Sequence, residues 1–216
     1  MDRSYLVVFD FDGVIADSID QYIKIWQKLF TQYGRTFPYS TRKIYREKYD
    51  SAWENVFLKN GFSKSELTEA VVNFEEFLTY DLVPIYDGIK EILEEIRKTS
   101  RLVILSSTKA KFITPWLKQY EILNLFEKVA GGDGKSEKSE KLRQLILELG
   151  ADENKTIMIG DTAADVRAGK SAHCSTIGVS YGWYESDRVK IESPDFQVDS
   201  PTELLAAYNK ITSSNS

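Results

Sequence analysis

Two aspartates, Asp10 and Asp12, stand two residues apart directly after the apolar run Tyr5–Phe9. A short run rich in valine and aromatic residues predicts a strand buried on both faces. Alternate residues of an extended chain point the same way, so both carboxylates can face one crevice beyond the strand, where Gly13 allows a sharp turn. An ordinary acidic turn is the plain alternative. Because neighbouring carboxylates repel each other unless a cation or a shared proton relieves them, the pattern indicates a place for Mg²⁺ and phosphate.

A second pair of acids follows the predicted strand Thr156–Ile159. Gly160 and Asp161 follow its end, and Asp165 lies four residues after Asp161, in the first turn of a predicted helix. Acids at a helix N-terminus are also common partners of the helix dipole. In a doubly wound sheet, however, neighbouring strand ends share one crevice, so we expect these acids to meet the first pair. Three or four carboxylates without a histidine suit a hard cation bound by oxygen, namely Mg²⁺.

Hydroxyl groups follow another predicted strand, Leu102–Leu105, which ends in Ser106-Ser107-Thr108-Lys109. Hydroxyls and free backbone N–H groups just before a helix N-terminus can hold phosphate oxygens. A simple helix N-cap is the alternative, because serine and threonine are common there. Ser106 and Ser107 are therefore candidate phosphate ligands.

A phosphate site of this kind also needs a fixed cation opposite the metal, and several lysines lie between residues 132 and 141. Most lysines in such a charged run are solvated. Lys138 opens the next predicted helix within reach of the strand ends, so it is the preferred candidate, with Lys135 as the alternative.

The composition excludes several other kinds of site. The chain has 216 residues, 42% of them hydrophobic, and a formal net charge of −5, which argues against nucleic acid or an anionic membrane as a partner. One cysteine rules out an intramolecular disulfide and a cysteine-based zinc site, and one histidine disfavours a Ser-His-Asp triad or a histidine-rich metal site. No signal peptide or apolar segment of transmembrane length is visible, so a cytoplasmic protein is expected.

Residues 17–82 follow a helical pattern. Apolar residues recur every three or four positions from Tyr22 to Tyr33, two shorter helices are predicted over 40–49 and 51–60, and Ser63 to Glu66 spells a capping box before a fourth helix. Strand-like alternation is absent from this block. We therefore predict a small four-helix insertion after the first strand.

From Val83 onward, predicted strands and helices alternate, which indicates a parallel sheet with helices on both faces. The predicted strands are Leu102–Leu105, one near Lys128–Gly131, Thr156–Ile159, Ser175–Val179 and one near Phe196–Val198; the predicted helices are 87–99, 109–120, 138–149, 163–171 and a last one after Ser200. The expected fold is α/β, a doubly wound Rossmann-like core of residues 1–16 and 83–216 with an inserted helical cap of residues 17–82.

These residues resemble a known family. Asp10-Phe-Asp12-Gly13-Val-Ile, Ser106, Lys138 and Gly160-Asp161-Thr162-x-x-Asp165 occur in the order of the four motifs of the haloacid dehalogenase-like hydrolase superfamily, and the resemblance covers nearly the whole chain. The helical insertion resembles the small cap of the phosphoglycolate phosphatase and β-phosphoglucomutase branch. The segment Ile177–Trp183 resembles the strand and loop after the fourth motif in phosphoglycolate phosphatase-like members.

The resemblance implies a role for each of these residues. Asp10 would be the nucleophile that forms an aspartyl-phosphate, and Asp12 the general acid for the leaving alcohol and then the base for water. Asp10, the backbone carbonyl of Asp12 and Asp161 would bind Mg²⁺, with Asp165 supporting them. Ser106, with its neighbour Ser107, and Lys138 would hold the phosphoryl oxygens.

The implied activity is Mg²⁺-dependent hydrolysis of a small phosphomonoester, phosphoglycolate-like or a sugar phosphate, by a monomer or homodimer. Dehalogenases do not require the second aspartate, so Asp12 argues against the reaction that names the superfamily. A phosphomutase shares all four motifs and remains open as an alternative. A non-catalytic phosphate-binding regulatory protein is a further alternative, which the complete set of catalytic groups disfavours.

Overall fold

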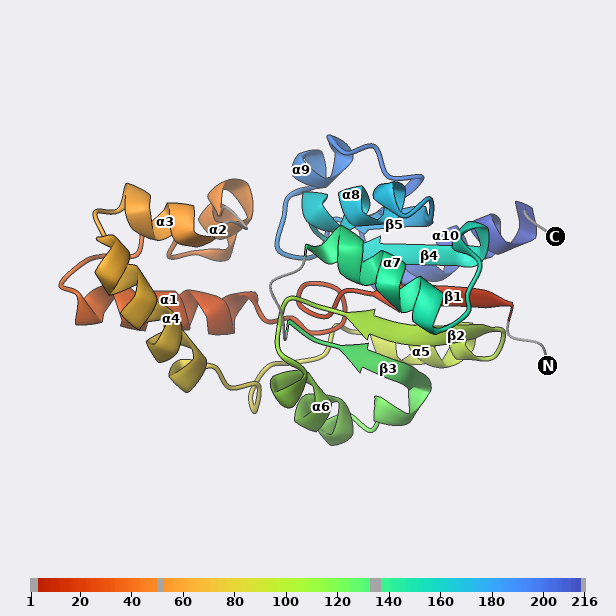
Figure 1. Cartoon of the computed structure of the whole chain (residues 1–216), viewed down its shortest axis with the longest axis horizontal. Helices are drawn as coiled ribbons and strands as arrows, with labels where there is room; N and C mark the ends of the chain where they lie inside the picture. Colours follow the sequence, from red (N-terminus) through yellow and green to blue (C-terminus); the bar gives the residue numbers. More distant parts are fainter. Residues whose placement is uncertain (1–3, 50–52, 133–136, 215–216) are drawn as a thin grey trace. The chain divides into compact units, whose positions relative to one another are not determined.

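The computed structural model describes residues 4–49, 53–132 and 137–214 (Figure 1). The chain divides into two compact units. The core unit comprises the residues up to Asp17 together with those from Val83 onward, and the helical unit comprises Ser18–Leu82.

Six strands in the described residues form one parallel sheet in the order β3-β2-β1-β4-β5-β6. The strands are β1 (Tyr5–Phe9), β2 (Ser100–Leu105), β3 (Phe126–Ala130), β4 (Thr156–Gly160), β5 (Ser175–Val179) and β6 (Phe196–Val198). All five residues of β1 are buried, as its unbroken apolar sequence predicts. Phe9 lies opposite Ile104 on one side and Ile159 on the other, so β1, β2 and β4 end at one edge of the sheet.

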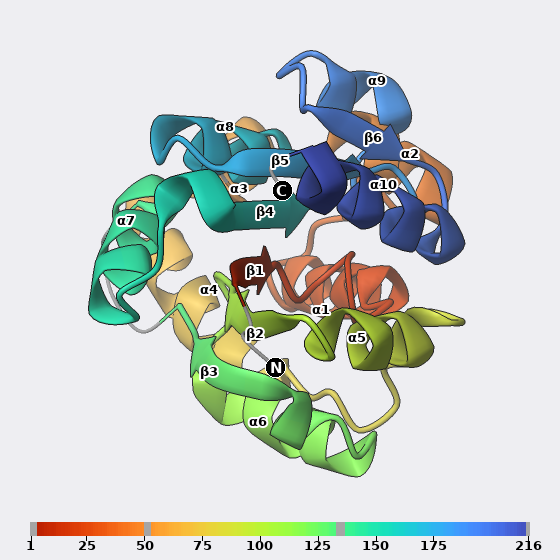
Figure 2. The same ribbon diagram turned by 90° about the vertical axis from the view of Figure 1, so that its right-hand side faces the viewer.

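Helices cover both faces of the sheet, which confirms the predicted α/β doubly wound fold (Figure 2). One face carries α5 (Ile89–Arg97), α6 (Ala110–Gln119) and α10 (Pro201–Ser214), and the other carries α7 (Lys138–Glu148), α8 (Ala163–Ser171) and α9 (Ser186–Lys190). Two short 3₁₀ helices, η1 (Leu123–Leu125) and η2 (Glu153–Lys155), precede β3 and β4. The sequence did not predict α9, because its five residues bury only Val189 and show no helical periodicity.

The sheet places its chemistry at a topological switch point. From β1 the chain moves to β2 and β3 on one side, and then crosses to β4 and β5 on the other. The helices that follow β3 and β4, namely α7 and α8, therefore lie on one face of the sheet. The helices that follow the helical unit and β2, namely α5 and α6, lie on the other face (Figure 2). In sheets of this kind, ligands bind beyond the carboxyl ends of the strands where the order reverses, which here is at β1 and β4.

The helical unit contains α1 (Ile19–Gln32), α2 (Arg42–Lys48), α3 (Trp53–Lys59) and α4 (Lys64–Phe77). Its core is aromatic: the ring of Trp26 stacks on Phe74 and meets Phe57 edge-on. The capping box predicted before α4 is present, because Ser63 and Glu66 each accept the other's backbone N–H. Within the described residues, no helix of either unit has both the length and the apolar character required to cross a membrane.

Candidate active site

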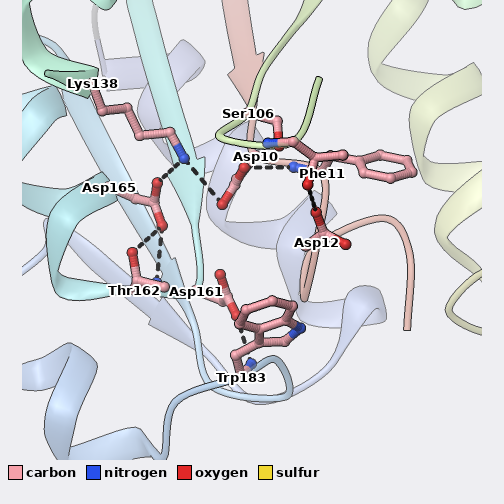
Figure 3. A network of polar contacts seen from close by, with 10 residues as sticks. Asp10, Phe11, Asp12, Ser106, Lys138, Asp161, Thr162, Asp165 and Trp183 are labelled. Carbon is pink, nitrogen blue, oxygen red and sulfur yellow. Dashed lines mark hydrogen bonds and ion pairs between the residues drawn. The ribbon is translucent and has the colours of Figure 1, made fainter. Parts of the chain in front are cut away.

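Three buried carboxylates converge at the end of the sheet. Asp10 follows β1, Asp161 follows β4, and Asp165 lies in the first turn of α8. A carboxylate oxygen from each of them lies within 4.8 Å of those of the other two. Figure 3 shows the three side chains gathered around one small region. The parallel pairing of β1 with β4 brings Asp10 and Asp161 together, as their positions after neighbouring strands predict.

Asp161 is held closely by the surrounding backbone. Its Oδ2 accepts the backbone N–H of Trp183 at 2.5 Å (Figure 3). Gly13 and Gly182 lie so near that a Cβ on either would overlap this carboxylate. Glycine is therefore required at both positions for the loops after β1 and β5 to enclose the Asp161 side chain.

The second oxygen of Asp161 provides a test of whether a cation fits here. This Oδ1 is buried and has no hydrogen-bond partner among the described residues. Burial, together with the nearby Asp10 and Asp165 carboxylates, raises the pKa of Asp161 well above its ordinary value. An unpartnered buried oxygen beside two further carboxylates is costly unless a cation neutralises it. The donors are all oxygens, so the arrangement fits a hard divalent cation.

Both oxygens of Asp165 already have protein partners. Its Oδ2 accepts the Thr162 backbone N–H at 2.9 Å and the Thr162 hydroxyl at 2.6 Å, and its Oδ1 pairs with Lys138. These contacts cap the N-terminus of α8 and fix the carboxylate. Because both of its oxygens are already engaged, Asp165 is better arranged to hold the groups around a metal ion in place than to bind the ion through both oxygens.

Lys138 is the first residue of α7, and its ammonium group lies between two of the acids. Its Nζ is 3.0 Å from Asp10 Oδ2 and forms a second ion pair with Asp165 (Figure 3). Burial lowers the pKa of Lys138, but the two carboxylates together raise it above its ordinary value, so the side chain stays charged. The alternative candidate, Lys135, lies outside the described residues.

Asp10 has the electrostatic environment of a group that can change its charge near neutrality. Its pKa is raised to about 7, mainly by burial; the Lys138 ammonium group opposes this rise, and the Asp165 and Asp12 carboxylates add to it. Its Oδ1 accepts the backbone N–H of Phe11 at 2.8 Å, which orients the carboxylate. An incoming cation would favour the charged form of this group.

Asp12 is buried near Asp10, but its carboxylate has a different partner. Its Oδ2 accepts the Thr108 hydroxyl at 2.6 Å. After Phe11 the chain closes a tight turn, because the Phe11 carbonyl accepts the N–H groups of Ile15 and Ala16. The metal role that the resemblance gives Asp12 uses its backbone carbonyl, so it does not depend on this side chain.

The hydroxyl cluster after β2 forms a second tight turn. Ser106 is buried, and its Oγ accepts the backbone N–H of Thr108 at 3.0 Å. Ser107 is exposed, and the backbone of the turn packs so closely on Gly131 and Gly132 that a Cβ on either would overlap it. The sequence did not predict the contacts that Thr108 and Trp183 make with the acids. Thr108 belongs to the hydroxyl cluster after β2, and Trp183 belongs to the segment that resembles the loop after the fourth motif. No rule of residue spacing indicates either contact.

Several known proteins resemble this chain in sequence and in fold. A sequence model described as haloacid dehalogenase-like hydrolase matches residues 7–179. A phosphoglycolate phosphatase from Vibrio parahaemolyticus is 27% identical, over 93% of this chain and 94% of its own length. Among solved structures, a predicted phosphatase from Clostridium acetobutylicum has a TM-score of 0.83 at 22% identity, over 96% of this chain and 99% of that one. A protein described as a β-phosphoglucomutase from Thermotoga maritima has a TM-score of 0.67 at 18% identity, over 97% and 99%.

Proposed function

The chain belongs to the haloacid dehalogenase-like hydrolase family. We propose that it is a phosphatase that hydrolyses a small phosphomonoester with the help of Mg²⁺. One observation carries the proposal: the buried carboxylates of Asp10, Asp161 and Asp165 converge around the end of β1 with Lys138 beside them. Phosphoryl transfer depends mainly on positioning and charge neutralisation, and this arrangement suits both.

The metal in this proposal is held by Asp10, Asp161 and the backbone carbonyl of Asp12, with Asp165 supporting them. Mg²⁺ is favoured over softer ions because every donor is an oxygen. When bound, the ion supplies positive charge that offsets the phosphoryl oxygens and the acids around them.

The side chains then divide the chemistry between them. Asp10 attacks phosphorus, so a bond forms between its carboxylate oxygen and phosphorus while the bond to the leaving alcohol breaks. Asp12 gives a proton to that alcohol and later takes one from the water that cleaves the aspartyl-phosphate. Lys138 and the Ser106–Ser107 turn hold the phosphoryl oxygens throughout both steps.

The substrate that we propose is small and phosphoglycolate-like, because several relatives of similar sequence are named phosphoglycolate phosphatases. A sugar phosphate is the alternative substrate. Phosphomutase activity is a second candidate, which the fold likeness to a protein described as a β-phosphoglucomutase supports. We further propose that the helical unit acts as the cap that selects the substrate.

The direct test is phosphate release from a panel that contains 2-phosphoglycolate, several sugar phosphates and an aryl phosphate, with and without Mg²⁺. We expect Mg²⁺-dependent release, and we expect Asp10→Asn to lower it by at least about a thousandfold, because the nucleophile is removed. Phosphate that moves to another hydroxyl of a sugar instead of entering solution would indicate a mutase. A folded wild-type protein that releases no phosphate from any substrate would contradict the proposal and favour a binding role.

A further inference from the structure

We propose that Thr108 is a positioning residue for proton transfer, because its hydroxyl holds the carboxyl group of Asp12 in the orientation that the reaction uses. The inference rests on the proposed function and extends it by one residue. It gives a role to the third hydroxyl group in the turn after β2. The first two, those of Ser106 and Ser107, are the proposed phosphate ligands.

The contact is short and buried. Thr108 Oγ1 donates to Asp12 Oδ2 at 2.6 Å, and the two residues are 7% and 8% exposed. They come from loops after neighbouring strands, because Asp12 follows β1 and Thr108 follows β2. A charged acceptor makes such a hydrogen bond stronger than one between neutral groups.

The backbone of Thr108 is fixed on both sides. Its N–H donates to Ser106 Oγ at 3.0 Å, and its carbonyl accepts the Gly132 N–H at 2.9 Å. The β-branched side chain also has few rotamers available. The hydroxyl therefore meets Asp12 from a rigid support, which is what orients a catalytic group.

A hydroxyl suits this task because it can both donate and accept. It donates to Asp12 when that group is a carboxylate, and it can accept from the same oxygen when the carboxyl is protonated. Asp12 passes through both forms as it serves first as acid and then as base. One threonine thus keeps the carboxyl in place during the whole cycle, while Ser106 in the same turn contacts the phosphoryl group.

The test compares Thr108→Val, which keeps the shape but lacks the hydroxyl, with the conservative Thr108→Ser. Each is assayed with 2-phosphoglycolate, whose alkoxide leaves only with a proton, and with p-nitrophenyl phosphate, whose leaving group needs none. The measurement is the pre-steady-state rate of the first, leaving-group-releasing step. We expect Thr108→Val to lower this rate by about 10- to 100-fold with 2-phosphoglycolate and by less than about 3-fold with p-nitrophenyl phosphate.

Under the same proposal KM and the Mg²⁺ affinity stay within about twofold of wild type, and Thr108→Ser keeps at least about half of the wild-type rate with both substrates. Equal losses with both substrates, or none, would overturn the role of Thr108 while leaving the phosphatase itself intact. A wild-type protein without activity, or Asp10→Asn as active as wild type, would instead overturn the proposed function and this inference with it. Thermal melting of each variant verifies that it is folded.

Discussion

Lys138 shows how much of the site depends on single charges. Its ammonium group contacts two of the three acids, and its side chain is only 14% exposed. Removing one partner from a buried ion pair leaves a charge without compensation, which is more costly than losing a surface pair. The lysine therefore stabilises the metal-free protein in addition to its proposed role with phosphate.

We predict that Lys138→Met lowers the free energy of unfolding of the metal-free protein by about 3 kcal/mol at neutral pH, because the acids are left to repel each other. Urea denaturation in the presence of a chelator measures this. Adding Mg²⁺ should recover part of the loss.

The matched control for that change is Lys141→Met, which alters a lysine one turn further along α7. We expect it to change the free energy of unfolding by less than about 1 kcal/mol. Equal effects of the two substitutions would show that the ion pairs of Lys138 do not stabilise the site.

Sequence reasoning succeeded at this scale where a residue's place follows from an element. Asp10 and Asp161 come directly after buried strands, and Lys138 opens a helix, so parallel pairing brings them together. Asp12 could not be placed in the same way, because it lies in a turn whose hydrogen bonds depend on residues up to Ala16. Its bond to Thr108, 96 residues away, is tertiary and leaves no local pattern.

At the scale of elements, the loops after β1 and β5 enclose the Asp161 side chain. Gly13 has a φ of +78°, which glycine adopts readily, and Gly182 lies against both Asp161 and the Gly13 carbonyl. The loop from Ser180 to Trp183 is further tied to the first loop, because the Tyr181 hydroxyl donates to the Val14 carbonyl at 3.2 Å. The position of Asp161, the proposed metal ligand, thus depends on two loops that fit closely together.

We predict that Gly182→Ala weakens Mg²⁺ binding by about 10- to 100-fold, the range found when a group that orients a metal ligand is lost. The added Cβ overlaps Asp161 and pushes it from its position. Isothermal titration with Mg²⁺ measures the affinity.

Gly88→Ala separates this overlap from backbone strain. Gly88 has a φ of +78°, but nothing lies near an added Cβ there. The substitution should lower stability modestly and leave Mg²⁺ affinity unchanged. If Gly182→Ala binds Mg²⁺ as tightly as Gly88→Ala does, the close fit around Asp161 has no bearing on metal binding.

Element order was largely predictable, because long periodic segments and strand ends are local features. The described strands and helices occur in the expected order. The short helix α9 was missed, since one buried valine gives no periodicity. The close approach of Gly182 to Gly13 was also out of reach, because it brings together residues that are distant in sequence.

For the whole molecule, the buried acids make the free energy of unfolding depend on pH. The pKa of Asp10 is raised to about 7 by burial, against an ordinary value of 3.8, and that of Asp161 is also raised. Between about pH 4 and about pH 7 the folded protein therefore keeps a proton that the unfolded chain has released. The contribution of protonated Asp10 to the free energy of unfolding is therefore present at low pH and is lost as the pH rises through about 7. Lys138 is charged in both states across this window, so it adds no slope.

Asp10→Asn removes the titrating group. We predict that the free energy of unfolding of the metal-free variant, taken relative to that of the wild type at the same pH, is about 2–4 kcal/mol higher at about pH 8 than at about pH 5. Urea denaturation at several pH values measures the difference. Asp187→Asn, at an exposed position in α9, is the control and should follow the wild-type curve. Wild-type and Asp10→Asn curves that stay parallel across this range would contradict the raised pKa.

In the proposed site, acids from the ends of β1 and β4 bind one ion together. Anomalous diffraction from a crystal grown with Mn²⁺ in place of Mg²⁺ tests this shared coordination. We expect one metal peak about 2.1 Å from a carboxylate oxygen of both Asp10 and Asp161. A metal peak that contacts only one of these residues, or none at this end of the sheet at saturating Mn²⁺, would contradict it.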